Sequence, residues 1–217
     1  MITNFIETNS IISDWIYQLR DTSIQEDRLR FRKNIERFGS IAAYEISKML
    51  PYKPVIAQTP LGEANCNIIE VQPVVATILR AGLPLYQGIL DFFDQADCAF
   101  IGAYRKHNKH NSSFEIDQQY ITCPELKGKH LILTDTMLAT GASIITALAT
   151  MIDNDMPEQI HIVCVIASTT GIENILRHYP DIHIWAGAID DELTAKGYIV
   201  PGLGDAGDLC FGSKKQD

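Results

Sequence analysis

The feature that most constrains this fold is an alternation between two kinds of apolar segment. Short runs rich in β-branched residues alternate with longer stretches whose apolar residues recur at helical spacing. The short runs, which we expect to be strands, are residues 73–79, 98–103, 130–133, 160–167 and 182–188. The expected helices carry Leu85, Ile89, Leu90 and Phe93, then Ile144, Ile145, Leu148 and Met151, then Ile172, Ile175, Leu176 and Tyr179. This alternation predicts an α/β fold with a doubly wound parallel sheet that helices cover on both faces.

The segments around this block are of a different kind. A long helical pattern from Phe31 to Met49 precedes it and stops at Pro51, and residues 51–72 are typical of irregular or hairpin structure. Residues 106–123 form a polar insertion that is long enough for a flap. We expect one domain over residues 1–217, with a core at about 68–190, a small hood from about 1–67 and 191–217, and a flap at about 106–123.

Charge and composition exclude several classes of partner. The net charge of −9 argues against a nucleic-acid partner, because such proteins need a basic face. The one basic run, residues 28–33, lies among acidic residues and is typical of a solvated helix face. No apolar stretch is long enough to cross a membrane, and the N-terminal residues show neither the basic n-region nor the long apolar run of a signal peptide. We therefore expect no membrane partner and a cytoplasmic protein.

The cysteines point to the same compartment. The five cysteines are scattered and show no C-x-x-C spacing, which is neither a disulfide framework nor a zinc site. Cys98 and Cys164 fall in expected strands, where a free cysteine behaves as a small apolar residue.

Unusual residues follow the ends of the expected strands. Ligands of open parallel sheets bind outside the carboxyl ends of the strands. The five strands lead in turn into Arg80-Ala81-Gly82, Tyr104-Arg105, residues 134–143, Ser168-Thr169-Thr170-Gly171 and Asp190-Asp191. Two arginines, several acids and two turns of small residues thus gather at one rim, where we expect the site.

The segment from Asp135 to Ser143 is the most informative of these. Small residues open the helix that follows it, so backbone N–H groups and the Thr140 and Ser143 hydroxyls can point at an anion. Such a cradle suits a phosphate monoester. The alternative is an ordinary N-cap turn, worth about 1 kcal/mol of helix stability. Gly-Lys-[Ser/Thr] is absent, so this is not a Walker P-loop.

A second glycine-rich stretch lies at residues 202–207. It satisfies G-x-G-x-x-G, but only residues 208–217 follow it, so a dinucleotide-binding βαβ unit cannot fit. We interpret it as a rigid loop whose backbone donors and acceptors face a small planar ligand.

Taken together, these motifs resemble the uracil phosphoribosyltransferase family. Residues 78–83 and 101–105 resemble its two arginine loops, residues 135–143 its phosphoribosyl-diphosphate loop, and residues 197–208 its uracil loop. The motifs occur in the family's order over almost the whole chain. Departures are Thr136, where the family usually has Pro, Ala142, where it usually has Gly, and residues 106–110, where it usually has acids.

The resemblance implies a type I phosphoribosyltransferase-like fold and a pentosyltransferase. The reaction would transfer the 5-phosphoribosyl group of phosphoribosyl diphosphate to N1 of uracil, giving UMP and diphosphate in pyrimidine salvage. It also implies Mg²⁺, held mainly by the substrate diphosphate with no protein ligand assigned, a homodimer or higher homo-oligomer, and in parts of the family allosteric control by GTP.

The resemblance also assigns residue roles. Arg80, Arg105, Asp135 and Asp205 would be catalytic. Phosphoribosyl diphosphate would be bound by these four together with Thr136, Met137, Leu138, Ala139, Thr140, Gly141, Ala142 and Ser143. Uracil would contact Ile199, Gly204, Asp205 and Ala206, mostly through the backbone.

Two rival hypotheses remain at this stage. One is a regulator with the same fold that senses nucleotides and binds RNA. The net negative charge of the chain argues against RNA binding. The other is a related transferase that uses a different base, such as hypoxanthine or orotate.

Overall fold

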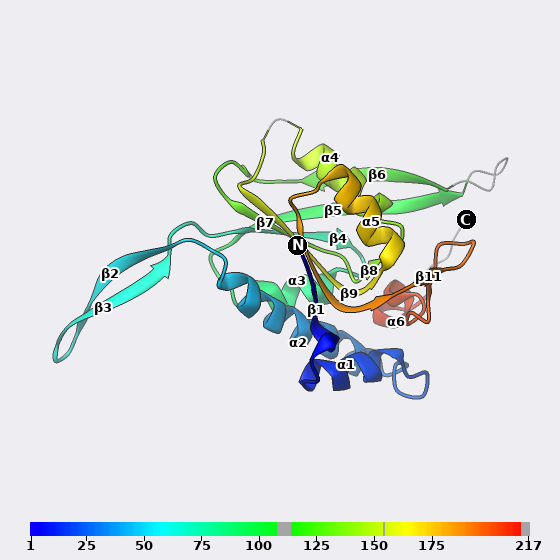
Figure 1. Ribbon diagram of the computed structural model, residues 1–217, viewed down its shortest axis with the longest axis horizontal. Coiled ribbons are helices and arrows are strands. Elements are labelled where there is room, and N and C mark those ends of the chain that lie inside the picture. Colours follow the sequence, from blue (N-terminus) through cyan, green and yellow to red (C-terminus); the bar gives the residue numbers. More distant parts are fainter. Residues whose placement is uncertain (108–113, 154, 214–217) are drawn as a thin grey trace.

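The protein is built around one twisted sheet with helices on both faces (Figure 1). The computed structural model describes residues 1–107, 114–153 and 155–213, and for residues 103–107 and 114–119 it describes the backbone alone. The strand order is β1-β10-β9-β7-β4-β5-β6. The bounds are β1 (Ile2–Asn4), β10 (His183–Asp190), β9 (Gln159–Ser168), β7 (His130–Thr134), β4 (Val74–Leu79), β5 (Asp97–His107) and β6 (Phe114–Thr122).

All neighbouring strands on this path are parallel except β6, which runs antiparallel to β5. The predicted α/β class with a central parallel sheet is confirmed. The short β8 (Met137–Leu138) also pairs with β9, parallel to it. It lies in the loop that follows β7 and was not predicted.

Each face of the sheet has its own apolar core. On one face pack α1 (Ile11–Arg20), α2 (Arg28–Ser47) and α3 (Leu83–Leu90), with side chains such as Phe38 and Ile89 completely buried. On the other face pack α4 (Ala142–Met151) and α5 (Thr169–His178). The strands between them are buried on both sides, which explains why their sequences are continuously apolar.

The prediction for β5 was wrong in its extent. The apolar pattern predicted that the strand ends at Ala103, whereas β5 continues to His107. Its parallel pairing with β4 stops at Gly102, and a register shift follows between Gly102 and Ala103. Beyond that point β5 pairs with β6 alone, so hydrogen bonding to a hairpin partner extends the strand into a polar sequence. The flap expected at residues 106–123 includes β6, and its residues 108–113 lie outside the described residues.

Residues 51–72, expected to be irregular or a hairpin, form the hairpin of β2 (Tyr52–Thr59) and β3 (Gly62–Ile69). This hairpin extends away from the body of the molecule (Figure 1). Near the carboxyl end of the sheet lie β11 (Glu192–Leu193), β12 (Ile199–Val200) and α6 (Ala206–Phe211). In the part of the chain that the structure describes, no helix is long and apolar enough to span a bilayer.

The chain reverses its winding between β4 and β7. These strands are neighbours, yet the helix that follows β4 covers one face and the helix that follows β7 covers the other. In open parallel sheets the carboxyl ends of two such strands flank a crevice. The loops that begin at Arg80 and Asp135 are the two that start there.

At the opposite end of the sheet, histidines of neighbouring strands contact one another. The His161 ring is fully buried, and its Nδ1 accepts a hydrogen bond from Trp185 Nε1 at 3.2 Å. Its Nε2 lies 3.1 Å from His130 Nδ1. Because the indole can only donate, the neutral His161 ring carries its proton on Nε2. Burial, followed by the neighbouring His130 and His183, lowers the pKa of His161 to about 3.

We expect acid to destabilise the fold through this residue. Histidine in the unfolded chain has a pKa of about 6.5. Below that pH the unfolded state therefore binds a proton at this residue, whereas His161 in the folded state stays neutral until its own lower pKa is reached. The free energy of unfolding should therefore fall as the pH decreases from about 6.5 towards 3. His161→Gln keeps an acceptor for Trp185 and removes the titration, so its slope should be shallower by up to about 1.4 kcal/mol per pH unit. Urea unfolding at a series of pH values measures both slopes, and equal slopes would contradict the assignment.

Candidate functional site

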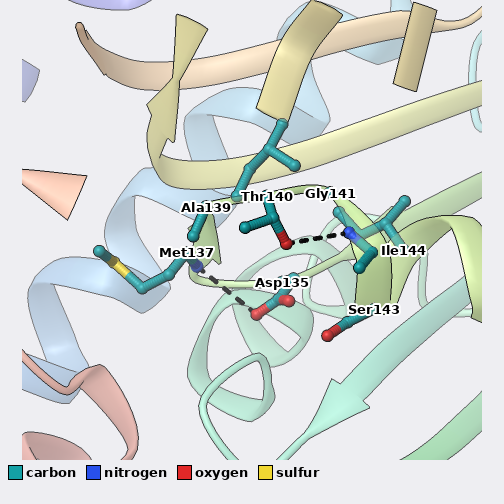
Figure 2. A pocket seen from close by; sticks show the side chains of 9 residues that line it. Asp135, Met137, Ala139, Thr140, Gly141, Ser143 and Ile144 are labelled. Atoms are coloured by element: carbon teal, nitrogen blue, oxygen red, sulfur yellow. Dashed lines mark hydrogen bonds between the residues drawn. The ribbon is translucent and has the colours of Figure 1, made fainter. Parts of the chain in front are cut away.

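A pocket opens at the carboxyl end of β7. Its lining residues are Asp135, Met137, Leu138, Ala139, Thr140, Gly141, Ala142, Ser143 and Ile144. Figure 2 shows the Asp135 carboxylate and the Thr140 and Ser143 side chains around this space. Eight of the nine residues expected to bind phosphoribosyl diphosphate in this segment line the pocket, and Thr136 does not.

The turn into α4 gives the pocket the shape of an anion cradle. Gly141 has a φ of +79°, a backbone conformation that L side chains rarely adopt, and directly precedes the helix. A carboxylate oxygen of Asp135 accepts from the Met137 amide at 3.5 Å, and the Thr140 hydroxyl accepts from the Ala142 amide at 3.4 Å (Figure 2). The helix N-terminus and its amides favour a bound anion here.

The neighbouring helix α5 holds this turn from behind. The Ser168 hydroxyl donates to the Ala139 carbonyl at 2.5 Å and accepts from the Gly171 amide at 2.9 Å. Asn174 Nδ2 donates to the Thr140 carbonyl at 3.1 Å. A Cβ at Gly171 would lie 2.2 Å from the Ala139 carbonyl oxygen, so a larger residue would displace the turn. The Ser168–Gly171 segment therefore supports the cradle.

Thr136 links the two loops of the crevice. Its side chain is completely buried, and its hydroxyl donates to the Ala81 carbonyl at 2.6 Å. Its own carbonyl accepts from the Val165 and Ile166 amides. The Thr136 hydroxyl is thus a direct tie between the loop after β7 and the loop after β4, which a proline at this position could not make.

Arg80 extends from the first of these loops towards α6. Its Nη2 donates to Asp208 Oδ1 at 3.1 Å, and both side chains are partly exposed. Asp205 caps α6 by accepting from the Asp208 amide at 3.0 Å. A Cβ at Gly207 would lie 3.2 Å from the Asp205 carboxylate and 3.4 Å from the Arg80 guanidinium. The structure thus places both the Arg80 and the Asp205 side chains next to Gly207, although Arg80 and Asp205 are far apart in the sequence.

The glycine-rich loop between β12 and α6 is anchored in the core. Ile199, Leu203 and Ala206 are buried in the same apolar cluster as α2. Gly204 is exposed and has a φ of +93°, and the nearest atom that a Cβ there would meet is Leu209 Cδ1 at 4.0 Å. Of the residues expected to contact uracil, Ile199 and Ala206 can offer backbone groups from fixed positions. Gly204 has no side chain that could obstruct a ligand at the loop.

Two residues of this region carried no signal of their own in the sequence. Arg20 and Asp190 form a bidentate ion pair, with distances of 2.8 and 2.7 Å, next to the glycine-rich loop. The sequence marked Asp190 only as an acid after the fifth expected strand. The two residues are 170 positions apart, so no local sequence pattern predicts that they pair.

Arg105 lies in β5, paired with Ile116 of β6, so it belongs to the strand rather than to a loop after it. Its backbone lies past the last residue of β5 that pairs with β4. Its side chain is outside the described set, and its role stays a prediction.

Within the described ranges, no group of three or more His, Cys, Asp and Glu side chains could hold a metal ion by itself. Mg²⁺ is commonly bound through one or two carboxylates together with substrate phosphates. The carboxylates near the crevice, Asp135 and Asp205, fit such shared binding.

Comparisons with known proteins agree on one family. A family model described as uracil phosphoribosyltransferase matches residues 6–213. A uracil phosphoribosyltransferase of Porphyromonas gingivalis is 46% identical over 207 residues, which is 95% of each chain. One of Sulfurisphaera tokodaii is 38% identical and covers 96% of this chain and 99% of its own. The solved structure of the AQ2163 protein from Aquifex aeolicus has a TM-score of 0.86 at 30% identity, covering 98% of both chains.

We expect the tie between Thr136 and Ala81 to be measurable as stability. Thr136→Val keeps the shape of the side chain and removes the donor, which should lower the free energy of unfolding by about 1–3 kcal/mol. Thr136→Ser keeps the hydroxyl and is the matched control. Denaturant unfolding compares them, and equal losses in both variants would show that the hydroxyl does not hold the loops together.

Proposed function

The chain belongs to the uracil phosphoribosyltransferase family, and from this premise we propose how its residues divide the work of the reaction. The enzyme transfers the 5-phosphoribosyl group of phosphoribosyl diphosphate to N1 of uracil, giving UMP and diphosphate. The observation that carries the proposed division is the ion pair of Arg80 and Asp208. It joins the loop after β4 to the first turn of α6, which directly follows the glycine-rich loop, so one crevice can hold both substrates.

In this proposal the sugar phosphate occupies the pocket after β7. The 5′-phosphate binds the amides and hydroxyls of residues 139–143, and the Asp135 carboxylate accepts hydrogen bonds from the ribose hydroxyls. The positive φ of Gly141 and the contacts from α5 support this placement, because they fix the donors before the ligand arrives. Thr136 fixes the loop after β7 by donating a hydrogen bond to the Ala81 carbonyl of the loop after β4.

Arg80 and Arg105 act on the diphosphate. When the bond between C1 and the diphosphate breaks, positive charge develops on the ribose and negative charge on the leaving group. The two guanidinium groups stabilise the leaving diphosphate by charge-assisted hydrogen bonds. Mg²⁺, when bound with the diphosphate, supplies further neutralisation of that charge. The Asp205 carboxylate lies beside Gly207, as the Arg80 guanidinium does, and in this proposal it helps to place the diphosphate with its Mg²⁺.

Uracil is bound by the loop before α6. Uracil N3–H lies between two carbonyl groups, so a backbone acceptor between two donors matches it and mismatches cytosine. Backbone groups of Ile199, Gly204 and Ala206 supply these partners, with Asp205 beside them. The burial of Ile199 and Ala206 supports this, since a backbone fixed by the core leaves little freedom to accommodate a different base.

Turnover tests the proposal directly. We expect the protein with Mg²⁺ to convert uracil and phosphoribosyl diphosphate into UMP, and a chelator to abolish the conversion. Arg105→Ala should lower kcat by about 100-fold or more without changing the melting temperature. Product formation is followed by chromatography. Turnover of hypoxanthine or orotate without UMP would overturn the assignment of the base, and unchanged kinetics of the variant would remove Arg105 from the site. Adding GTP to the same assay tests the allosteric effector that the resemblance implies.

We also propose that the enzyme is a homodimer. The hairpin of β2 and β3 extends from the body (Figure 1) and exposes Tyr52, Ile56, Leu61 and Ile68 to solvent. Apolar side chains on an isolated two-stranded arm need cover, and a second copy of the chain offers it.

Sedimentation equilibrium should therefore give twice the mass of one chain. Ile56→Lys places a charge on the arm and should shift the protein towards monomer. Gln87→Lys adds the same charge at an exposed position of α3, away from the arm, and should leave the mass unchanged. A monomeric wild-type protein at micromolar concentration would contradict the proposal.

Two further proposals concern the domain organisation and the compartment. We treat residues 1–217 as one domain with a core, a hood and a flap as defined above. We place the enzyme in the cytoplasm, which the five free cysteines support, since such thiols persist in reducing compartments.

A further inference from the structure

A buried ion pair holds one residue of the glycine-rich loop from both sides. Arg20, at the end of α1, donates through Nη1 and Nη2 to the two carboxylate oxygens of Asp190 at 2.8 and 2.7 Å. The Arg20 and Asp190 side chains are 22% and 7% exposed, so water screens the pair weakly.

Both members of the pair also bond to the backbone of Gly202. Asp190 Oδ2 accepts from the Gly202 amide at 2.9 Å, and Arg20 Nη1 donates to the Gly202 carbonyl at 2.9 Å. Asp190 ends β10 and Gly202 follows β12, so these bonds close the base of the excursion that contains β11 and β12. The three residues form a clamp, which we call the Arg20 clamp.

The backbone conformation at Gly202 is tightly restricted. It has a φ of +58°, and a Cβ there would lie 2.3 Å from the Ile199 carbonyl oxygen. Ile199, Gly204 and Ala206 on either side of it are the proposed backbone partners of uracil. A small rotation at Gly202 would therefore move these groups relative to one another.

The end of α1 is itself held in place. Gln25 is buried and its amide donates to the Arg20 carbonyl at 2.8 Å, and the Asp21 amide caps the helix by donating to the Tyr17 carbonyl at 2.9 Å. The guanidinium thus projects from a fixed position in the N-terminal segment.

We propose that Arg20 is a positioning residue for base recognition: through the Arg20 clamp it sets the backbone of the loop that binds uracil, while the sugar-phosphate pocket is independent of it. This inference rests on the proposed function only for the identity of the base. Arg20 contacts no residue of the pocket lining among the contacts described for it, and its partners belong to β10 and to the glycine-rich loop.

The test uses the full-length enzyme and four changes. Arg20→Met removes the charge and both contacts at similar length. Arg20→Lys keeps the charge but loses the planar fork that bonds both carboxylate oxygens of Asp190. Arg20→Met combined with Asp190→Asn removes the uncompensated buried charge and keeps an acceptor for the Gly202 amide. Lys33→Met breaks the exposed pair of Lys33 and Glu36 on α2 and is the control.

We expect Arg20→Met to raise the KM for uracil about tenfold or more, because hydrogen bonds to charged groups contribute on this scale, with the KM for phosphoribosyl diphosphate little changed. Arg20→Lys should fall between this variant and the wild type. The double variant should recover thermal stability but keep the raised KM for uracil, since the Gly202 carbonyl still lacks its donor. The control should behave as wild type.

Amide hydrogen exchange of residues 199–206 gives a second readout without turnover. Exchange should be faster in Arg20→Met and unchanged in Lys33→Met. Equal rises in both KM values, or lower stability with an unchanged KM for uracil and unchanged exchange, would overturn the proposal. Absence of UMP in the wild-type assay would instead refute the proposed function, and the exchange experiment would still decide whether Arg20 holds the loop.

Discussion

The site depends on one topological constraint, the reversal of winding between β4 and β7. Because α3 and α4 cover opposite faces of the sheet, the chain leaves β4 and β7 in opposite directions, and a crevice forms above the ends of these two strands. The loop that starts at Arg80 and the loop that starts at Asp135 must therefore face each other there. The Thr136 hydroxyl fixes their spacing by its bond to the Ala81 carbonyl. The ion pair of Asp208 with Arg80 ties α6 to the loop after β4, and so places the end of the glycine-rich loop at the same crevice.

The two proposed substrate regions are supported by different parts of the chain. The pocket after β7 is held by α5, through Ser168 and Asn174. The glycine-rich loop is held by the N-terminal helix, through Arg20, and by its own buried side chains. In the proposed division of the site, this separation would let base selection and sugar-phosphate binding be altered independently. It would also give the N-terminal segment a part in the site, although none of the residues that line the pocket belongs to it.

Much of this architecture could be predicted from the sequence, because a parallel sheet buried on both faces leaves continuous apolar runs. All five expected strands exist, and the cradle at Asp135–Ser143 lines a pocket. The extension of β5 to His107 could not be predicted, since a hairpin partner rather than apolar burial stabilises it. The short β1 could not be predicted either, because a strand of three residues is too short to show an apolar periodicity. The Arg20 clamp joins residues 170 and 182 positions apart, and no local pattern reports such a contact.

The central claim is that one crevice at the β4–β7 reversal binds the sugar phosphate on one side and the base on the other. A crystal structure of the protein with UMP tests it most directly. The account predicts that the phosphate contacts the amides of residues 139–143 and that the uracil ring contacts the backbone of Ile199, Gly204 and Ala206. A phosphate bound away from the turn into α4, or a base held outside the glycine-rich loop, would contradict it.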